Sequence, residues 1–331
     1  MKINKIAVLT SGGDSPGMNT ALRAVVRTCA YNKIECLGVV RGYQGLINDD
    51  IKVLKTRSVR GIINRGGTML YSARSEEFRT KEGRKTAYEN VKKHGIQGLV
   101  VIGGDGSFTG GLIFQKEFGV PVIGIPGTID NDLYGTTHTL GYDTALNTVM
   151  DAIDKIRDTA ISHDRLFFVE VMGRDAGHIA LNSGIAIGAQ EILVPEHNLG
   201  IEGLVESLKD SKKNHKTSSI VVVAEGDKTG KNVFDLAQKI EKIFPKYEIR
   251  VSVLGHMQRG GSPSCFDRVL GTRMGVIAVE SLINGDSGKM IGVDNGKIVT
   301  TSLKKAIKGE TKIDPELVRI SRIMNIWYKL S

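Results

Sequence analysis

The chain has 331 residues, of which 40% are hydrophobic, so it is long enough for two ordinary domains with cores of their own. Its formal charge is +9, but the basic residues are scattered and aromatic residues make up only 5%, which favours small anionic ligands over nucleic acid. No apolar run approaches the ~20 residues that span a bilayer, and the chain turns polar before a secretory apolar core could form. The three cysteines lack the spacing of a zinc site or a disulfide framework, which fits a reducing cytoplasm. Together these features predict a cytoplasmic protein that binds neither nucleic acid nor membrane.

Short β-branched strands alternate with amphipathic helices from the beginning of the chain. Residues 6–9, 99–103 and 120–125 have the composition of buried strands, and residues 21–31 have the periodicity of a helix. In that helix the apolar positions follow the spacing i, i+3, i+4, i+7, which predicts one buried stripe made of Leu22, Val25, Val26 and Cys29.

A second series with the same alternation begins near residue 143. A long helical pattern covers 143–160, and strand patterns follow at 166–172, 219–226 and 249–255. This βαβ alternation is typical of parallel sheets with helices on both faces. The sequence therefore predicts an α/β protein of two similar doubly wound lobes with mainly parallel sheets.

Three loops rich in glycine and aspartate follow predicted strands. They read TSGGDSPGMN at 10–19, GGDGS at 103–107 and PGTIDND at 126–132. Ligands of open α/β sheets gather at the carboxyl ends of the strands, and the first two loops lead into helices, whose N-terminal N–H groups favour phosphate. Neither loop is a Walker A motif or a GxGxxG motif. Each loop alone is equally well explained as a tight corner or a solvated turn, but the three together predict a polyphosphate site.

The acids in these loops suit phosphoryl transfer. Asp105 and Asp132 are candidates to hold Mg²⁺, which needs only one or two carboxylates when phosphate oxygens supply other ligands. Asp130 is a candidate to take a proton from an attacking hydroxyl. A metal, cations on the moving phosphate and a residue that orients the nucleophile are the main parts that phosphoryl transfer requires.

Five motifs in order then make a specific match. LTSGGDSPGMN at 9–19, GGDGS at 103–107, PGTIDND at 126–132, VMGRDAGH at 171–178 and LGHMQRGGSP at 254–263 resemble the bacterial 6-phosphofructokinases. The resemblance extends from about residue 6 to about residue 299. It implies that ATP phosphorylates the 1-hydroxyl of fructose 6-phosphate, a step of glycolysis, in a homotetramer. It also implies an ATP-binding lobe at 1–141 and 258–308, and a fructose 6-phosphate-binding lobe at 142–257 and 309–331.

The resemblance assigns roles to individual residues. Asp130 matches the general base, and the catalytic set is Gly13, Arg74, Thr128, Asp130 and Arg174. The nucleotide-binding positions are Gly13, Tyr43, Arg74, Ser75, Asp105, Gly106, Ser107 and Gly110. The magnesium positions are Asp105 and Asp132. The positions that bind fructose 6-phosphate are Thr128, Asp130, Asp132, Arg165, Met172, Gly173, Arg174, Glu225, Arg250, His256 and Arg259.

Planar guanidinium groups suit both the transferred phosphate and the sugar 6-phosphate. The resemblance implies that Arg165 and Arg250 reach the sugar 6-phosphate across a subunit interface. Taken alone, Arg165 leaves a surface role open, His256 favours a structural hydrogen-bonding role, and Glu225 is equally well a solvated end of a strand.

Two glycines bear on the phosphoryl donor. Pyrophosphate-using relatives typically carry Asp and Lys where this chain has Gly106 and Gly127, so ATP is the expected donor. Two alternatives stay open: a pyrophosphate-dependent phosphofructokinase, and a catalytically silent sensor of sugar phosphates or nucleotides. The set of catalytic side chains argues against the sensor, because a pure binding protein needs no proton acceptor.

Bacterial members are commonly activated by ADP and inhibited by phosphoenolpyruvate at a second, intersubunit site. The matching basic positions are Arg23, Arg27, Arg157 and Lys216. The family's metal-binding acid falls on Gln190, and a further basic position falls on Asn214. An amide is a weaker magnesium ligand than a carboxylate, so we expect ADP activation to be weak or absent.

The end of the chain, from about residue 304 to 331, matches the family weakly and contains the single Trp327. We expect a packed terminal helix there and assign it no function.

Overall fold

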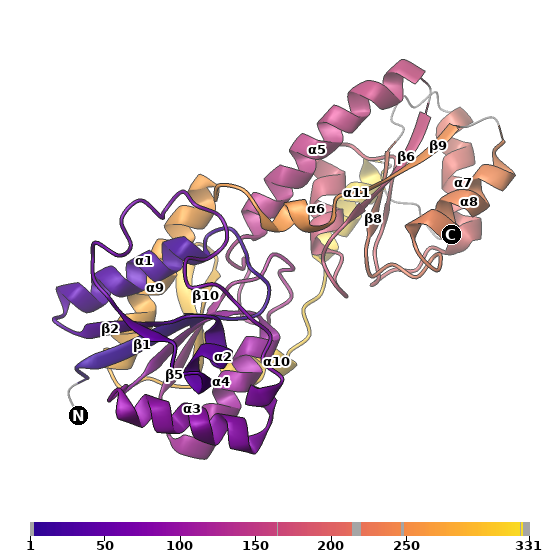
Figure 1. The fold of residues 1–331 in the computed structure, drawn as a ribbon. Coiled ribbons are helices and arrows are strands. Elements are labelled where there is room, and N and C mark those ends of the chain that lie inside the picture. The colour runs from indigo at the N-terminus through magenta and orange to yellow at the C-terminus, as the bar shows by residue number, and fades with distance from the viewer. Residues whose placement is uncertain (1–2, 164, 214–219, 246–247, 325, 327–331) are drawn as a thin grey trace. The chain divides into compact units, whose positions relative to one another are not determined.

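The computed structural model describes residues 3–163, 165–213, 220–245, 248–324 and 326 (Figure 1). The chain divides into two compact units, each built from separate stretches of sequence. Unit 1 comprises Met1–Ile129, Leu133–Thr144 and Arg259–Thr311, and unit 2 comprises Asp130–Asp132, Ala145–Gln258 and Lys312–Ser331.

Unit 1 is built on one sheet, which has seven strands within the described residues, in the order β11-β10-β5-β4-β1-β2-β3. Its strands are β1 (Lys5–Thr10), β2 (Glu35–Val39), β3 (Ile51–Leu54), β4 (Leu99–Gly103), β5 (Val122–Pro126), β10 (Lys289–Asp294) and β11 (Lys297–Ser302). Adjacent inner strands pair in parallel, and only the edge strands β3 and β11 pair antiparallel with their neighbours. The mainly parallel α/β fold class predicted from the sequence is confirmed.

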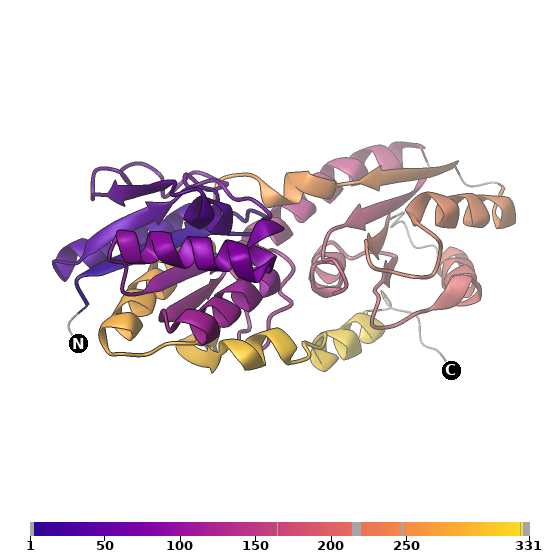
Figure 2. The same cartoon turned by 60° about the horizontal axis from the view of Figure 1, so that its bottom comes forward.

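Helices cover both faces of this sheet because the inner strands are apolar on both sides (Figure 1). Ile6 and Val8 of β1 join the core formed with α1 (Met18–Tyr31) and α9 (Cys265–Ile283). Ala7 and Leu9 face the opposite core. The helices of that second core are α2 (Gly42–Ile47), α3 (Lys81–Lys93), α4 (Asp105–Phe118) and α10 (Leu303–Lys308), and Figure 2 shows the layers from another side.

Helix α1 packs through the stripe that its periodicity predicts. Leu22, Val25, Val26 and Cys29 are each at most 1% exposed. Its neighbour α9 approaches closely because Gly275 has no side chain there: a Cβ would lie 2.6 Å from the carbonyl oxygen of Ala21. The two helices thus form one closely packed layer over the sheet.

Unit 2 contains a smaller sheet. Within the described residues its strands are β6 (Arg165–Val171), β7 (Glu191–Leu193), β8 (Ile220–Ala224) and β9 (Glu248–Val253), in the parallel order β7-β8-β6-β9. The helices of this part of the chain are α5 (Tyr142–His163), α6 (His178–Ala186), α7 (Gly200–Lys213), α8 (Val233–Ile243) and α11 (Pro315–Ile323). Leu166 and Phe168 of β6 pack with Leu236 and Ile240 of α8 in a separate apolar core. Helix α5 begins in unit 1 and continues into unit 2.

The end of the chain differs from the single terminal helix expected from the sequence. It forms α10, whose Leu303 belongs to a core of unit 1, and α11, which contacts α6 of unit 2. The residues between them are not helical, and Pro315 with the Asp314 cap begins a new helix, so one continuous helix is wrong here. Trp327 lies outside the described residues.

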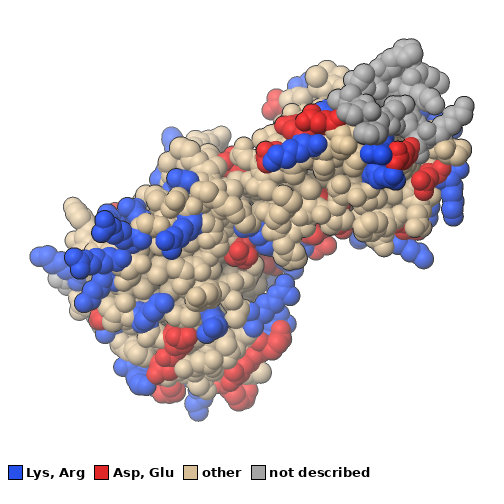
Figure 3. Space-filling model, turned by 45° about the horizontal axis from the view of Figure 1, so that its top comes forward, with Lys and Arg blue, Asp and Glu red and all other residues tan. Residues whose placement is uncertain are grey.

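One face of the molecule carries charge in small groups. On the face shown in Figure 3, clusters of Lys and Arg are separated by other residues and by Asp and Glu. In the part of the chain that the structure describes, no helix combines the length and apolar character needed to cross a bilayer.

Candidate active site

The three glycine-rich loops converge at the carboxyl ends of β1, β4 and β5. The N–H of Ser11 donates to the carbonyl of Ile102 at 3.0 Å, and the N–H of Gly127 donates to the carbonyl of Gly103 at 3.0 Å. Gly103 must lack a side chain, because a Cβ would lie 2.5 Å from the carbonyl oxygen of Ser11. The parallel sheet therefore brings together loops that lie at 10–19, 103–107 and 126–132 of the sequence.

The first loop presents exposed backbone. Gly12 has a φ of +85°, which favours glycine, and its carbonyl accepts a hydrogen bond from Ser72 Oγ at 2.8 Å. Gly13 is exposed, and a Cβ there would lie 2.6 Å from Nη1 of Arg259. Nη1 of Arg259 also donates to the carbonyl of Asp14 at 3.3 Å. The predicted phosphate-binding Gly13 and the predicted sugar-binding Arg259 are thus neighbours.

The second loop forms the beginning of α4. Gly104 is the N-cap residue, Asp105 is the first helical residue and Ser107 is 5% exposed. A Cβ on Gly12 would lie 3.4 Å from Ser107 Oγ, so the first two loops lie side by side. Gly106 is exposed, and a Cβ there would meet no atom within 4 Å. The N–H groups of the first turn make this helix end suitable for an anion.

Tyr43 and its neighbours support this helix end. Tyr43 is 5% exposed, its hydroxyl donates to the carbonyl of Ser107 at 2.6 Å, and its ring stacks on Phe78 at 4.1 Å between centroids. Burial raises the pKa of the Tyr43 phenol far above its usual value. Gly110 lies against the same ring, since a Cβ there would be 3.1 Å from Tyr43. The phenol hydroxyl of Tyr43 therefore anchors the helix.

Arg74 and Ser75 lie in the segment before the short helix Glu77–Arg79. Ser75 Oγ donates to Gln44 Oε1 at 2.6 Å and accepts from the N–H of Phe78 at 3.1 Å. Arg74 is exposed, so its guanidinium is accessible to a charged ligand.

Hydrogen bonds join the two ends of the third loop, which follows β5. The N–H of Leu140 donates to the carbonyl of Pro126 at 2.7 Å, and Thr139 Oγ1 donates to the carbonyl of Thr128 at 2.6 Å. Thr128 and Asp130 are each 7% exposed, and Asn131 has a φ of +54°. Asparagine adopts this left-handed conformation more readily than other residues with a side chain, which suits the tight turn of the loop.

In unit 2, the segment that contains Met172, Gly173 and Arg174 is held by side chains at both sides. Glu225 Oε1 accepts from the N–H of Arg174 at 2.5 Å and from that of Gly173 at 3.2 Å. The N–H of Met172 donates to Gln258 Oε1 at 3.2 Å. Arg174 has a φ of +56°, a left-handed conformation that is unfavourable for arginine and is frequent at functional sites. The carboxylate of Glu225 therefore holds a loop as well as ending a strand.

Arg165 is the first residue of β6, and Arg250 is the third residue of β9, which pairs with β6. Both guanidinium groups bond Glu248: Arg165 Nε donates to Oε2 at 2.8 Å, and Arg250 Nη2 donates to Oε1. The neighbouring arginines, Arg165 first, lower the pKa of the Glu248 carboxyl. Sequence reasoning missed Glu248, although its place two residues before Arg250 was a signal. His256, in the short helix Gly255–Arg259, is exposed.

The predicted effector residues are only partly described. Arg27 is exposed on α1 and Arg23 is half-buried, whereas Arg157 Nη2 donates to the carbonyl of Ile187. Gln190 is 8% exposed. Lys216 and Asn214 lie outside the described residues.

Protein side chains alone do not form a metal cage in the described part of the chain, where no three His, Cys, Asp or Glu residues are grouped closely enough to hold an ion. Mg²⁺ is usually held by one or two carboxylates together with phosphate oxygens and water. Asp105, half-exposed at the first turn of α4, is a suitable donor.

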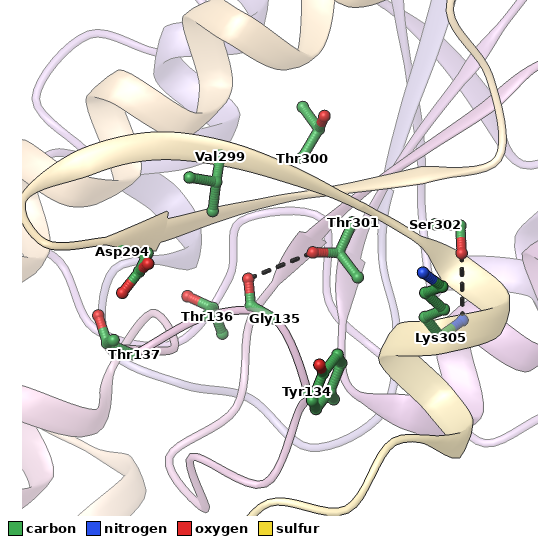
Figure 4. A pocket seen from close by; sticks show the side chains of 10 residues that line it. All are labelled: Tyr134, Gly135, Thr136, Thr137, Asp294, Val299, Thr300, Thr301, Ser302 and Lys305. Atoms are coloured by element: carbon green, nitrogen blue, oxygen red, sulfur yellow. Dashed lines mark hydrogen bonds between the residues drawn. The ribbon is translucent and has the colours of Figure 1, made fainter.

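A pocket of about 740 Å³ lies elsewhere in unit 1 (Figure 4). Its lining comes from the segment after the third loop, from β10 and β11, and from α10, and consists of Tyr134, Gly135, Thr136, Thr137, Asp294, Val299, Thr300, Thr301, Ser302 and Lys305. The predicted site residues are not part of this lining, so cavity size does not identify the candidate site.

Two α/β units, with phosphate-suited loops at the strand ends of the first, define a phosphate-handling α/β protein. A family model described as phosphofructokinase matches residues 5–282. The ATP-dependent 6-phosphofructokinase 2 of Bacteroides thetaiotaomicron is 51% identical over 97% of this chain and 98% of its own. The ATP-dependent 6-phosphofructokinase 1 of Thermus thermophilus is 51% identical over 97% of this chain and 99% of its own. The chain belongs to the phosphofructokinase family.

Solved structures share the fold. The phosphofructokinase of Saccharomyces cerevisiae superposes with a TM-score of 0.87 at 35% identity over 97% of this chain. This chain spans 46% of that longer yeast chain. A pyrophosphate-dependent phosphofructokinase from Marinobacter aquaeolei gives a TM-score of 0.85 over 99% of this chain and 89% of its own, but only 20% identity, so that likeness concerns the fold alone.

Proposed function

We propose that this protein is an ATP- and Mg²⁺-dependent 6-phosphofructokinase of cytoplasmic glycolysis. It transfers the terminal phosphoryl group of ATP to the 1-hydroxyl of fructose 6-phosphate and releases ADP and fructose 1,6-bisphosphate. The observation that carries the proposal is the convergence of the three loops at the ends of β1, β4 and β5, in a chain about half identical to ATP-dependent relatives along its whole length.

Unit 1 supplies the nucleotide-binding groups in this proposal. The exposed N–H of Gly13 and the first turn of α4, with Gly106 and Ser107, bind phosphate oxygens, and Arg74 adds positive charge. Asp105 of unit 1, together with Asp132, which belongs to unit 2, would hold Mg²⁺, which neutralises charge on the phosphates. Tyr43, Ser75 and Gly110 shape and support the nucleotide site.

Thr128 and Asp130, which follow β5, act on the attacking hydroxyl. The carboxylate of Asp130 takes the proton of the sugar hydroxyl as that oxygen attacks phosphorus, and Thr128 orients the reacting groups. Arg174, whose side chain is exposed in unit 2, supplies a permanent positive charge that stabilises the negative charge developing on the transferred phosphoryl group.

Unit 2 supplies most of the sugar-binding groups. Met172, Gly173, Arg174, Glu225 and His256 contact the sugar, as does Arg259 of unit 1. Arg165 and Arg250 bind the 6-phosphate across a subunit interface of a homotetramer. The carboxylate of Glu248, which bonds both arginines, holds the two guanidinium groups near one another on β6 and β9.

ATP is the donor because Gly106 leaves room beside the phosphates. A Cβ at this position meets nothing in the protein itself, so internal packing does not require glycine here. Gly127 is different: a Cβ there would lie 3.0 Å from Ile102 and from Met18, so its packing already requires a small residue. Gly106 is thus the stronger support for ATP.

The effector site is proposed to respond weakly to ADP. Arg23, Arg27, Arg157 and Lys216 provide positive charge, but Gln190 stands where an acid would hold the magnesium of the nucleotide.

The test measures fructose 1,6-bisphosphate formation from fructose 6-phosphate with Mg²⁺ and either ATP or pyrophosphate. Turnover with ATP alone is expected, and turnover with pyrophosphate alone would make the pyrophosphate enzyme the correct alternative. The variant Asp130→Ser should bind fructose 6-phosphate but lose about 10²-fold or more of kcat. A wild-type protein that binds the sugar phosphate and turns over with neither donor would be a sensor.

A further inference from the structure

A buried carboxylate lies where three loop-bearing segments of unit 1 meet. Asp267, in the first turn of α9, is 0% exposed. Its backbone N–H donates to Ser264 Oγ, the N-cap of α9, at 3.2 Å. Gly17, the N-cap of α1 and the end of the first glycine-rich loop, is adjacent, since a Cβ there would lie 3.6 Å from the Cβ of Asp267.

Both oxygens of this carboxylate bond the beginning of α5. Oδ1 accepts from the N–H of Gly141 at 2.8 Å, and Oδ2 accepts from the N–H of Thr144 at 2.8 Å and from Thr144 Oγ1 at 2.5 Å. The first N–H groups of a helix have no partner within the helix, and a negative charge there also interacts favourably with the helix dipole. Asp267 therefore caps α5 from a different helix.

On one side, this cap fixes the end of the loop that carries Asp130. Gly141 directly follows Leu140, whose N–H donates to the carbonyl of Pro126 at 2.7 Å. Thr139 Oγ1 donates to the carbonyl of Thr128 at 2.6 Å, so the beginning and the end of the loop are joined next to the residues that Asp267 holds. A shift of Gly141 would move the base of this loop.

On the other side, the same network fixes the segment that follows Arg259. Thr144 Oγ1 accepts from the N–H of Ser264 at 2.9 Å while it donates to Asp267. Ser264 Oγ donates to Asp143 Oδ2 at 2.5 Å. One threonine hydroxyl thus links the beginnings of α5 and α9.

Stability alone is a weak reason for such a group. The pKa of Asp267 is raised from 3.8 to about 6, because burial, assisted by the Asp143 carboxylate, outweighs the hydrogen bonds from Thr144 and Gly141 that lower it. The cost of removing a carboxylate from water offsets much of what its hydrogen bonds contribute, so a buried charge is a poor way to gain stability. The two carboxylate oxygens of Asp267 instead hold the N–H of Gly141 and the N–H and hydroxyl of Thr144 in one fixed arrangement.

We propose that Asp267 is a positioning residue for phosphoryl transfer, which acts through Gly141 and Thr144 on the loop after β5 and on the segment before α9. The inference rests on the proposed function. In this proposal Asp267 contacts neither the sugar phosphate nor the nucleotide. It determines instead where the residues that contact them are placed.

The central comparison uses Thr144→Val, which keeps the shape of the side chain and removes the hydroxyl, and Thr144→Ser, which restores it. The matched control is Thr28→Val: Thr28 is also buried, but its hydroxyl donates only to the carbonyl of Ala24 in its own helix at 2.8 Å. Asp267→Asn is the fourth variant, because an amide presents N–H where a carboxylate accepts N–H. Each protein is characterised by its melting temperature, its kcat and KM for both substrates, and hydrogen exchange of its backbone amides.

We expect kcat to fall at least about tenfold in Thr144→Val and Asp267→Asn, since small misplacements of reacting groups reduce rates strongly. The KM for ATP should change less than about twofold, Thr144→Ser should recover most of the kcat, and exchange should accelerate in both 127–144 and 260–266. Thr28→Val should lower the melting temperature without changing kcat.

Wild-type kcat in folded Thr144→Val would overturn the proposal, as would a Thr144→Ser variant no better than Thr144→Val. If Asp267→Asn does not fold, the threonine pair still decides. A wild-type protein without kinase activity would refute the proposed function instead, and the exchange data would then show separately whether the two segments are coupled.

Discussion

Gly106 offers a test in which stability and activity should change in opposite directions. It is the second residue of α4, its φ is not in the left-handed region, and a Cβ there meets no atom within 4 Å. Replacing a helical glycine by alanine gains up to about 1 kcal/mol, and an acidic residue in the first turn gains about 0.3–1 kcal/mol. Both Gly106→Ala and Gly106→Asp should therefore fold and melt no lower than the wild type.

The activity of Gly106→Asp with ATP should nevertheless fall. If nucleotide phosphates lie over the first turn of α4, the new carboxylate faces them. Two like unit charges about 5 Å apart repel by about 3 kcal/mol at an effective dielectric constant of about 20, which corresponds to roughly 10²-fold in kcat/KM. Gly106→Ala adds only a methyl group, so it should lose less than about tenfold.

The assay is initial-rate kinetics of fructose 1,6-bisphosphate formation with varied ATP at saturating Mg²⁺, for the wild type and both variants. Thermal melting on the same preparations provides the stability comparison, and the KM for fructose 6-phosphate is an internal control. If Gly106→Asp keeps the wild-type kcat/KM for ATP, the phosphates do not lie at this helix end, and the argument from Gly106 to the donor is refuted.

Three further outcomes are expected. Glu117→Gln should weaken the paired hydrogen bonds that Arg84 donates to Glu117 at 2.6 and 2.8 Å. Urea titrations should then show a free energy of unfolding lower by about 1–3 kcal/mol, while the enzyme kinetics stay unchanged. Unchanged stability would show that this ion pair contributes little. The pKa of Asp267 is about 6 in the folded protein against 3.8 unfolded, so the folded state binds more protons in between. Its contribution to the free energy of unfolding should therefore fall by about 3 kcal/mol as the pH rises from about 4 to above 6, and Asp267→Asn should remove this dependence. ADP at saturating Mg²⁺ should activate the enzyme weakly, and Gln190→Glu should strengthen activation; strong activation of the wild type would contradict the role given to Gln190.

The sequence predicted the fold class and the core of α1 because these depend on local periodicity. Leu22, Val25, Val26 and Cys29 recur with the period of a helix, and each is buried as that spacing requires. The terminal helix was predicted wrongly because the break before Pro315 separates two weak helical patterns, and their separation into two units depends on distant contacts.

The candidate site was also predicted in part: the sequence indicated its residue types but not the contacts between distant residues. The residue types of the three loops and the order of the five motifs are properties of the chain, and they were sufficient to predict the chemistry and the family. Glu248 and Asp267 were missed because an isolated acid in a sequence gives no indication of its partners. Asp267 becomes notable only when Gly141 and Thr144, more than 120 residues earlier, donate to it.

The sequence by itself therefore determined which chemical groups are present and which secondary structures carry them, because side-chain chemistry and helical or strand periodicity are local. Only the tertiary structure decided which of those groups meet. The parallel sheet brings the ends of β1, β4 and β5 to one edge, and the packing of α9 against α1 places a carboxylate at the beginning of α5. These contacts depend on burial and hydrogen bonding between segments that are distant in sequence, so local sequence patterns do not predict them.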